Sequence, residues 1–574
     1  LFVSEALERL GTLVRQAEML AAQYNAVVAN PPYMGRKYQA TIIRGYLSDQ
    51  YEGYEKDLFS AFAIRCSALG FPTARIGMMS PNVWMYLSSY EKFRQFVSSR
   101  QTLSSLVELP LSGFKGATVQ ICSFTFSNTQ TPRAKGSFIR LVDFKGSDPE
   151  MSAYTKQAVK DSTCGWFFET ALEQFSKIPG SPVAYWVSND FFETFGGRVF
   201  DDIATPKQGL ATGENARFLR LWFEVQSSGI ALNCASNEEA MSTARSWVPY
   251  SKGGEFRRWS GCHLHVVFWA NGGETIRNFT DENGNERSRF RAAAYYFKPA
   301  ITWGDITSSL FSARYREAGY VFDITGMSAF SADLSFCLGL LNSNYAQSAL
   351  AFINPTLHCQ IGDIRRVPVA SSVDKEKVSV VVDAMVRFAK SDWNAYERSW
   401  DFQSLALLTV SSEPAPTLEY GYTVWITQNR DTIAEMKRLE EENNRLFIDA
   451  YGLADELTPD VPIEQITLTV NPAYRYGGKL TEEEQWTRFR QDTMEELVSY
   501  AIGCMMGRYS LDAPGLIYAH SGNEGFDPSR YTTFPADHDA IIPILEGNWF
   551  TDDIVERLKE FLKVTFGTEN YEEN

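Results

Sequence analysis

The tetrapeptide Asn30-Pro31-Pro32-Tyr33 carries groups that could perform chemistry on an exocyclic amine. Asn30 has an amide oxygen that accepts hydrogen bonds, and Pro31 offers a backbone carbonyl but no N–H. Two neighbouring acceptors can each take one N–H of an amine, while the Tyr33 ring can stack on the heterocycle that bears it. As the amine attacks an electrophile, positive charge develops on its nitrogen, and oxygens already aimed there stabilise it. The tetrapeptide therefore indicates group transfer to an aromatic amine, although the same residues could form a plain turn.

The residues before the tetrapeptide predict where it lies in a fold. The run 26–29 is small and apolar, as in a fully buried central strand. Two prolines cannot donate to a sheet ladder, so the strand must stop at Asn30. Open α/β sheets bind their ligands at the carboxyl ends of their strands. We therefore expect Asn30 at such an end.

Helical and extended patterns alternate along the first 150 residues, which predicts an α/β sheet domain. The expected helices and strands are helices at 5–23, 56–69 and 84–97, and strands at 26–29, 75–80, 103–109 and 119–126. Later helices are expected at 431–450 and 495–506, with a last helix entered through a Thr-Asp cap at 551–553.

Length and composition limit the class of protein. At 574 residues with 44% hydrophobic residues, the chain suggests about three or four folded domains. No apolar run approaches the roughly 20 residues of a membrane span, and the first residues lack a signal-like core. The eight cysteines show no Cys-x-x-Cys spacing, which indicates buried free thiols in the reducing bacterial cytoplasm. His263 and His265 have no carboxylate or cysteine at ligand spacing, so we expect no metal site.

The net charge of −16 is unevenly distributed. Residues 411–574 carry about −18, which leaves about +2 for residues 1–410. The segment from Arg245 to Arg316 contains 11 basic and 6 acidic residues, interleaved with aromatic ones. This segment is therefore the best nucleic-acid footprint of the chain.

Asn30 to Tyr33 resembles the catalytic motif of the amino-methyltransferases that modify adenine N6 in DNA. The wider run Asn30-Pro-Pro-Tyr-Met-Gly35 and the phrases at 507–512 and 541–553 resemble the adenine methyltransferases of BREX phage-defence systems, the PglX family. The resemblance implies a partial Rossmann-like methyltransferase sheet, then a mixed α+β target-recognition domain and a mostly helical C-terminal domain. It also implies S-adenosyl-L-methionine as cofactor, double-stranded DNA as substrate and flipping of the target adenine.

The resemblance assigns roles to individual residues. Asn30 to Tyr33 would be catalytic, and Asp57 and Phe59 would contact the adenosine part of the cofactor. Tyr33 and Phe114 would hold the flipped base between them. Phe59 could equally be a core helix residue, whereas the glycines around Phe114 favour a functional loop. In this family a glycine-rich cofactor loop precedes the catalytic motif, but no such turn occurs among the 29 residues before Asn30, so we expect no methylation by this chain alone.

Two later stretches resemble target-recognition domains, and small residues in them would let the backbone approach phosphate closely. For any one residue the alternative is a solvated surface with ordinary salt bridges. The candidate DNA-binding residues are Lys207, Asn215, Arg217, Lys252, Arg257, Arg258, Arg314 and Arg316.

These patterns predict five segments. They are a catalytic half-domain at 1–150, a connector at 151–190, a target-recognition domain at 191–370, a helical connector at 371–410 and an acidic, mostly helical domain at 411–574. The acidic domain would be repelled by DNA and could dock other BREX defence proteins, or it could be a plain solvated domain. Two rival functions stay open: the modification part of a fused restriction–modification enzyme, and a catalytically silent DNA-recognition scaffold.

Overall fold

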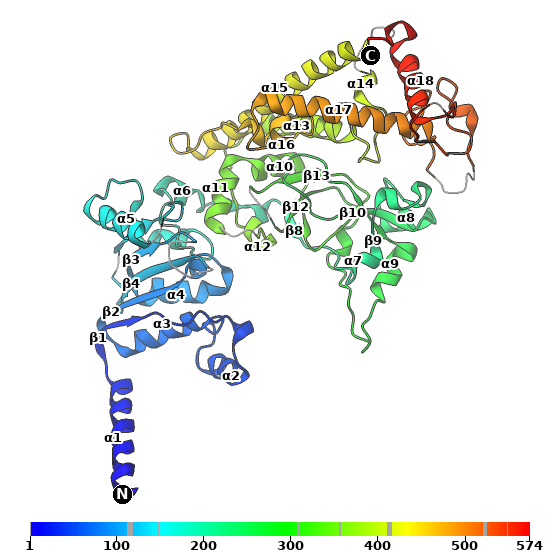
Figure 1. Ribbon diagram of the computed structural model, residues 1–574. Helices are drawn as coiled ribbons and strands as arrows, with labels where there is room; N and C mark the ends of the chain where they lie inside the picture. Colours follow the sequence, from blue (N-terminus) through cyan, green and yellow to red (C-terminus); the bar gives the residue numbers. More distant parts are fainter. Residues whose placement is uncertain are drawn as a thin grey trace. The chain divides into compact units, whose positions relative to one another are not determined.

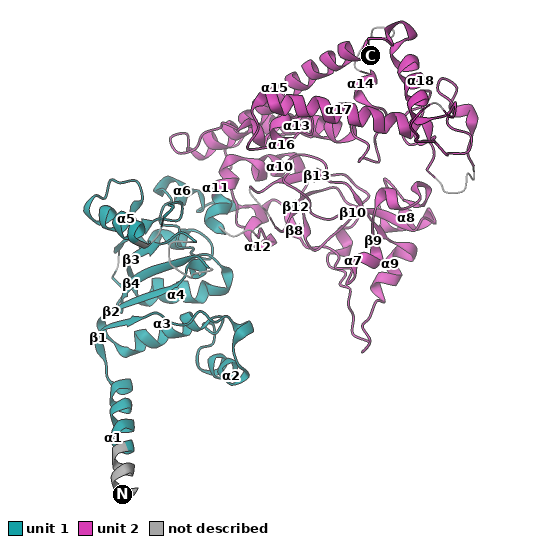
Figure 2. Cartoon of the chain, viewed as in Figure 1, with its two compact units in different colours: residues 1–198, 349–356 teal, residues 199–348, 357–574 magenta. Residues whose placement is uncertain are grey.

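The computed structural model describes residues 2–111, 119–131, 133–146, 148–306, 310–354, 358–409, 416–519, 525–547 and 549–573, with only the backbone given at 2–8 and 148. The chain forms two compact units (Figure 2), residues 1–198 with 349–356, and residues 199–348 with 357–574. Both units combine helices and sheets (Figure 1), so the predicted α/β and α+β character is confirmed.

A six-stranded sheet in the order β1-β2-β4-β3-β5-β6 organises the first unit. Four strands, β1, β2, β3 and β5, run in one direction, and β4 and β6 run in the other. The carboxyl ends of the four parallel strands therefore share one edge of the sheet. The strands are β1 (Tyr24–Ala29), β2 (Gly70–Pro81), β3 (Thr102–Glu108), β4 (Ile121–Ser127), β5 (Lys135–Arg140) and β6 (Phe167–Ala171). Because β6 pairs with β5, the sheet extends beyond the predicted limit at residue 150.

The predicted buried central position of β1 is wrong. Among the described residues β1 pairs with β2 alone, and Val28 is 84% exposed. A small apolar run fits an interior strand, but the run itself does not encode how many strands flank it.

Helices α3 (Leu58–Leu69) and α4 (Glu91–Arg100) pack against the sheet of the first unit, α3 on β1 and β2 and α4 on β3. The other helices of this unit are α1 (Phe2–Ala21), α2 (Thr41–Gln50), α5 (Asp148–Lys160) and α6 (Asn189–Thr194). The helix predicted at 84–97 begins only at Glu91. Before it, Arg94 donates to the carbonyls of Trp84 and Leu87 at 2.8 and 2.7 Å, so a side chain satisfies carbonyls at two 3₁₀ turns.

Two four-stranded sheets, β14-β10-β11-β9 and β13-β12-β15-β8, form the first part of the second unit. The strands of these two sheets are β8 (Thr205–Lys207), β9 (Leu219–Leu221), β10 (Trp247–Ser251), β11 (His265–Phe268), β12 (Ala300–Gly304), β13 (Ala313–Arg316), β14 (Val321–Phe322) and β15 (Gly326–Phe330). Two short strands, β7 (Arg198–Val199) and β16 (Pro368–Val369), pair with each other. Tyr250, Trp269 and Phe322 belong to one buried cluster between these elements.

Long helices complete the second unit, and α13 packs on both α10 and α15 (Figure 1). The remaining helices are α7 (Asn215–Phe218), α8 (Asn237–Ser242), α9 (Ala270–Arg277), α10 (Leu334–Asn342), α11 (Asn344–Ile353, with residues in both units), α12 (Ile361–Ile364), α13 (Lys375–Asn394), α14 (Ala406–Thr409), α15 (Leu418–Tyr451), α16 (Pro472–Tyr476), α17 (Glu482–Met505) and α18 (Ile554–Phe566). The Asp553 carboxylate accepts from the Val555 N–H at 2.9 Å, which confirms the predicted cap. The acidic segment thus shares one compact unit with the predicted target-recognition segment. Among the described helices, none is both long and apolar enough to cross a bilayer.

Candidate active site and nucleic-acid interface

The loop Asn30-Pro31-Pro32-Tyr33 follows β1 directly, at the edge where the parallel strands end. Asn30 is exposed, Pro31 is buried, and Tyr33 is 39% exposed. The Tyr33 hydroxyl donates to the amide oxygen of Asn30 at 3.3 Å. Burial raises the pKa of Tyr33, with a further contribution from Cys122 on β4, so the hydroxyl stays a donor at neutral pH. An exposed amide oxygen thus has its orientation set by the ring beside it.

Asp57 joins this loop to the amino end of α3. Its carboxylate accepts the N–H of Met34 at 2.9 Å and the N–H of Phe59 at 3.4 Å, the second as the helix cap. The N–H of Leu58 also donates to the Met34 carbonyl at 3.2 Å. Burial raises the pKa of Asp57, and the hydrogen bonds from Met34 and Phe59 oppose that rise. The predicted cofactor ligand therefore also fixes the end of the catalytic loop.

Phe59 lies in the core and leaves no ring surface for a cofactor. It is 0% exposed and packs against Tyr90 and Phe93, with ring centroids 5.4 and 6.4 Å away. The predicted adenosine contact of its ring is therefore wrong, and the alternative of a core helix residue describes it. Phe114 lies outside the described residues.

A buried carboxylate that the sequence did not single out ends β3 at the same edge of the sheet. Glu108 is 3% exposed and accepts from Asn82 at 2.8 Å, Tyr86 at 3.0 Å and Tyr185 at 2.7 Å. Burial and the charge of Glu108 raise the pKa of both tyrosines, which keeps them neutral donors. Burial and the same charge raise the pKa of Cys122 to about 12. Only the position of Glu108 and Asn82 at strand ends could have marked them in the sequence.

Four of the predicted DNA-binding residues keep side-chain surface. Asn215 and Arg217 are exposed, and Lys207 and Lys252 are half-buried. The Thr212 hydroxyl donates to Asn215 at 2.6 Å, so the backbone turn before α7 is held in place. These four side chains can reach a ligand at the surface.

The other four predicted DNA-binding residues are interior, and their predicted DNA contacts are therefore wrong. Arg257, Arg258, Arg314 and Arg316 are each 2% exposed or less. Arg257 pairs with Asp392 and Arg258 with Glu440, both at 2.7 Å. Arg314 donates to the carbonyls of residues 255 and 257, and Arg316 donates to Ser328 and to the carbonyl of residue 298. Each guanidinium thus has at least one partner inside the chain, as buried charged groups require, although the Nε atoms of Arg258, Arg314 and Arg316 have none among the described residues.

Three further arginines, which were not among the predicted DNA-binding residues, are exposed to solvent. Arg287, Arg289 and Arg291 alternate along an extended segment, and all three are exposed. Residue 289 forms an antiparallel bridge with Ala211, with N–H···O distances of 2.8 and 3.0 Å. Arg287 also lies close to Arg217 of α7, because the guanidinium groups of both residues lie over the ring of Phe279. Their alternating spacing was the available signal.

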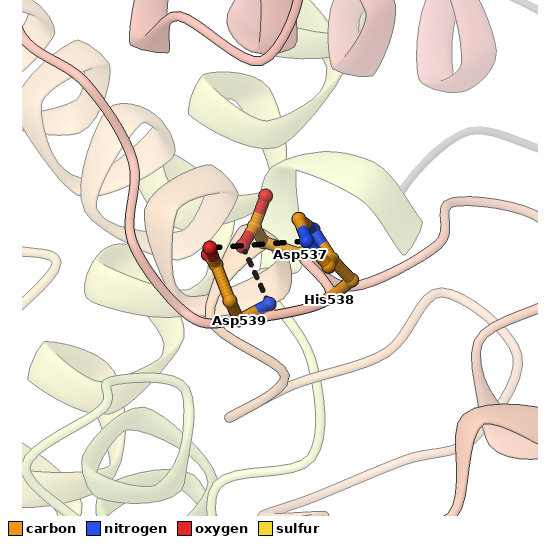
Figure 3. Close-up of side chains that lie close together, drawn as sticks. All are labelled: Asp537, His538 and Asp539. Atoms are coloured by element: carbon orange, nitrogen blue, oxygen red, sulfur yellow. Dashed lines mark hydrogen bonds and ion pairs between the residues drawn. The ribbon is translucent and has the colours of Figure 1, made fainter.

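Asp537, His538 and Asp539 form a group of potential metal-ligand residues in the described part of the chain (Figure 3). The Asp537 carboxylate accepts the N–H groups of Asp539 and Ile541 at 3.1 and 3.3 Å. His538 and Asp539 are exposed, and their side chains lie 3.8 Å apart. The turn hydrogen bonds of Asp537 and the exposed His538–Asp539 contact explain why these three side chains lie close together.

Known proteins are similar in sequence to part or nearly all of this chain. Residues 7–114 match the family described as Eco57I restriction-modification methylase. The adenine-specific methyltransferase PglX of Lacticaseibacillus casei (strain Zhang) is 34% identical, over 98% of this chain and 46% of that protein. The adenine-specific methyltransferase BrxX of Escherichia coli O9:H4 (strain HS) is 33% identical, over 99% of this chain and 46% of that protein. The chain thus spans about half the length of these curated relatives.

Two solved DNA complexes show weaker likeness. The restriction-modification enzyme MmeI with DNA gives a TM-score of 0.44 at 9% identity and covers 82% of this chain and 57% of that chain. The DrdV–DNA complex gives a TM-score of 0.39 at 10% identity and covers 66% of this chain and 45% of that chain. The likeness that identifies the family lies in the sequence: over nearly its whole length the chain is homologous to the adenine-specific methyltransferases PglX and BrxX, and the predicted resemblance to that family is confirmed.

Proposed function

We propose that this chain forms the adenine-binding and DNA-binding part of a site-specific DNA adenine N6-methyltransferase of the BREX type. The observation that carries the proposal is the loop Asn30 to Tyr33 at the carboxyl end of a parallel strand, tied to α3 by Asp57. Its homology to proteins named adenine-specific methyltransferases supports the same reaction class.

The loop residues would hold the reacting amine. Asn30 accepts one N6 hydrogen through its amide oxygen and keeps the Tyr33 hydroxyl bond on the same atom, since an amide oxygen has two lone pairs. The Pro31 carbonyl accepts the second N6 hydrogen. Tyr33 stacks on one face of an adenine flipped out of the duplex, and Phe114 is proposed for the other face. Both oxygens then stabilise the positive charge that develops on N6.

S-adenosyl-L-methionine would supply the electrophilic methyl group. The two residues predicted to contact its adenosine do not fit that role by themselves. Phe59 has no exposed surface, and the Asp57 carboxylate holds the Met34 and Phe59 N–H groups. We therefore propose that cofactor binding needs parts of the longer protein that PglX and BrxX represent, and that residues 1–574 alone do not methylate DNA.

The DNA would lie along the exposed basic residues of the second unit. Arg287, Arg289 and Arg291 alternate along one segment and are all exposed, and Arg287 lies over the same Phe279 ring as Arg217. Guanidinium groups at this spacing can contact successive phosphates, which positions the duplex, or reach base edges in a groove. The half-buried Lys207 and Lys252 are further candidates.

A role in BREX anti-phage defence rests on the homology to PglX, and the acidic segment 411–574 is the proposed surface for other BREX proteins. Its charge of about −18 would favour basic protein surfaces and disfavour DNA.

The test is sequencing of methylated adenine in cells that express the full-length protein with its neighbouring genes. Wild type should give N6-methyladenine at one asymmetric motif, and Asn30→Ala should abolish it. Binding of a duplex that carries the motif should persist in Asn30→Ala, since Asn30 does not belong to the DNA surface proposed above. Unchanged methylation in the variant would refute the catalytic role of Asn30.

The modification part of a restriction–modification enzyme is the second candidate. It is favoured by one observation, the match of residues 7–114 to the Eco57I restriction-modification methylase family. Cleavage of unmodified motif-bearing DNA by the full-length protein would support this candidate over the BREX role. If Asn30→Ala left both methylation and defence intact, a silent recognition scaffold would be the better description.

A further inference from the structure

A cavity of about 550 Å³ in the second unit lies far along the chain from the proposed methylation loop. Phe256, Tyr396, Arg398, Tyr474, Arg475 and Glu496 are among the residues that line it. They come from the segment after β10, the segment after α13, and helices α16 and α17. A cavity of this size matches those that hold small organic ligands in proteins.

Arg398 is the guanidinium of this cavity that lacks an acidic partner. Arg475 pairs with Asp492 and Glu496, both at 3.0 Å. Arg398 makes no ion pair with any described residue, and its Nη2 donates to the hydroxyl of Thr469. Its Nε is buried and has no hydrogen-bond partner among the described residues. Burial and the nearby Arg257 lower the pKa of Arg398, and the charges of Asp392 and Glu255 oppose that shift.

Two more donors of the same cavity lack acceptors. The Tyr396 hydroxyl and the Nη1 of Arg475 are buried without a hydrogen-bond partner in the described part of the chain. The guanidinium carbons of Arg398 and Arg475 lie 5.6 and 5.9 Å from the centre of the Tyr396 ring. Burial and the charges of Asp392 and Glu496 raise the pKa of Tyr396, so its hydroxyl remains a donor. Because unpaired buried donors are costly, three of them around one ring favour an acceptor-rich ligand.

The other residues that line the cavity suit an organic group attached to such an acceptor-rich ligand. Phe256 and Tyr474 offer aromatic surface, and the Tyr474 hydroxyl donates to the Phe256 carbonyl at 2.6 Å, which fixes them together. Glu397 and Glu496 can accept from amines or hydroxyls of a ligand. A phosphate alone would leave most of the cavity unused.

We propose that this cavity binds a nucleoside phosphate, with its phosphate on Arg398 and the Tyr396 hydroxyl and its base against Phe256 and Tyr474. Arginine is suited to this task because its planar donors match phosphate oxygens in pairs. The phosphate comes either from a free nucleotide or from the end of a DNA strand. The site is separate from Asn30 to Tyr33, so it does not depend on the proposed methyl transfer.

The test is isothermal titration of the 574-residue chain with the four nucleoside 5′-monophosphates, with nucleosides and with inorganic phosphate. At least one nucleotide should bind at least ten times more tightly than its nucleoside or phosphate alone. Arg398→Gln should weaken that binding about tenfold or more, and Tyr396→Phe, which removes one hydroxyl, should weaken it several-fold. Arg438→Gln is the matched control, because Arg438 is an exposed arginine of α15.

The outcomes separate clearly. Absence of nucleotide binding, or equal binding by wild type and Arg398→Gln with both folded by circular dichroism, would overturn the proposal. Phosphate binding without any preference for a nucleotide would also overturn it. A 5′-phosphorylated oligonucleotide that displaces the nucleotide identifies a strand end as the source, and failure to displace it identifies the free nucleotide. If Arg398→Gln does not fold, the Tyr396→Phe variant decides.

Discussion

Arg258 donates to a carboxylate oxygen of Glu440 at 2.7 Å, although 182 residues separate the two in sequence and each side chain is 2% exposed. The indole N–H of Trp259 donates to the other oxygen at 2.8 Å. A second buried pair, Arg257 with Asp392, repeats the arrangement one residue earlier. The sheet-rich part of the second unit and its long helices are therefore joined by charges that neither part could bury alone.

Removal of Glu440 should destabilise the second unit strongly. Glu440→Ala leaves the Arg258 guanidinium buried without its partner, and loss of one member of a buried pair costs about 3–5 kcal/mol. Urea unfolding followed by circular dichroism measures the change. Glu435→Ala on the same helix is the control, because the Glu435–Arg438 pair is exposed to solvent and should contribute little to stability. Equal small losses in both variants would contradict the structural role of the buried pair.

The sequence was more informative about local elements than about partners. Strand β2, helix α3 and the cap of α18 follow from local patterns, because a strand, an apolar helix face and a capping carboxylate depend on neighbours within a few residues. The partners of Arg257 and Arg258 lie more than 130 residues further along the chain, so the charge pattern could not show that these arginines are buried.

At the proposed site, too, the local element could be predicted from the sequence and the contacts between distant segments could not. The loop at Asn30 to Tyr33 could be predicted, because the prolines end the strand locally. The network around Glu108 could not, because Asn82, Tyr86 and Tyr185 reach it from separate segments.

The exposed arginines, and not the buried ones, should control DNA binding. Arg289→Ala should weaken binding to duplex DNA uniformly across sequences and lower the slope of log affinity against log salt by about 1 if the residue contacts one phosphate. Fluorescence anisotropy at several salt concentrations measures both quantities. If Arg289 reads a base edge, the loss will instead be confined to the recognised motif, by about 1–3 kcal/mol.

The controls for this experiment come from the same unit. Arg438→Ala removes an exposed arginine of α15 and should leave DNA affinity unchanged. Arg316→Ala removes a buried guanidinium and should reduce stability before it affects affinity. A loss of affinity with Arg438→Ala as large as with Arg289→Ala would mean that general charge, and not this segment, drives binding.

The Glu108 network should stabilise the edge of the sheet that carries the catalytic loop. Tyr185→Phe removes the donor at 2.7 Å and leaves a buried carboxylate with one fewer hydrogen bond, which should cost about 1–3 kcal/mol. Urea unfolding of residues 1–574 provides the measurement. Tyr38→Phe, at a side chain that is 75% exposed, is the matched control and should be neutral. A neutral Tyr185→Phe would show that the network does not hold this edge together.

His263 should make the protein less stable as the pH falls below neutrality. Burial, with the positive charges of Arg314 and Arg316, lowers the pKa of the half-buried His263 to about 3, against about 6.5 for a histidine in the unfolded chain. Between these pH values the unfolded state binds a proton that the folded state does not. The free energy of unfolding therefore declines by at most about 1.4 kcal/mol for each unit by which the pH falls. His263→Phe should remove this contribution, so the stability difference between wild type and variant should change steadily between pH 6.5 and 4 in urea titrations. A difference that stays flat with pH would show that His263 is protonated as easily in the folded as in the unfolded protein.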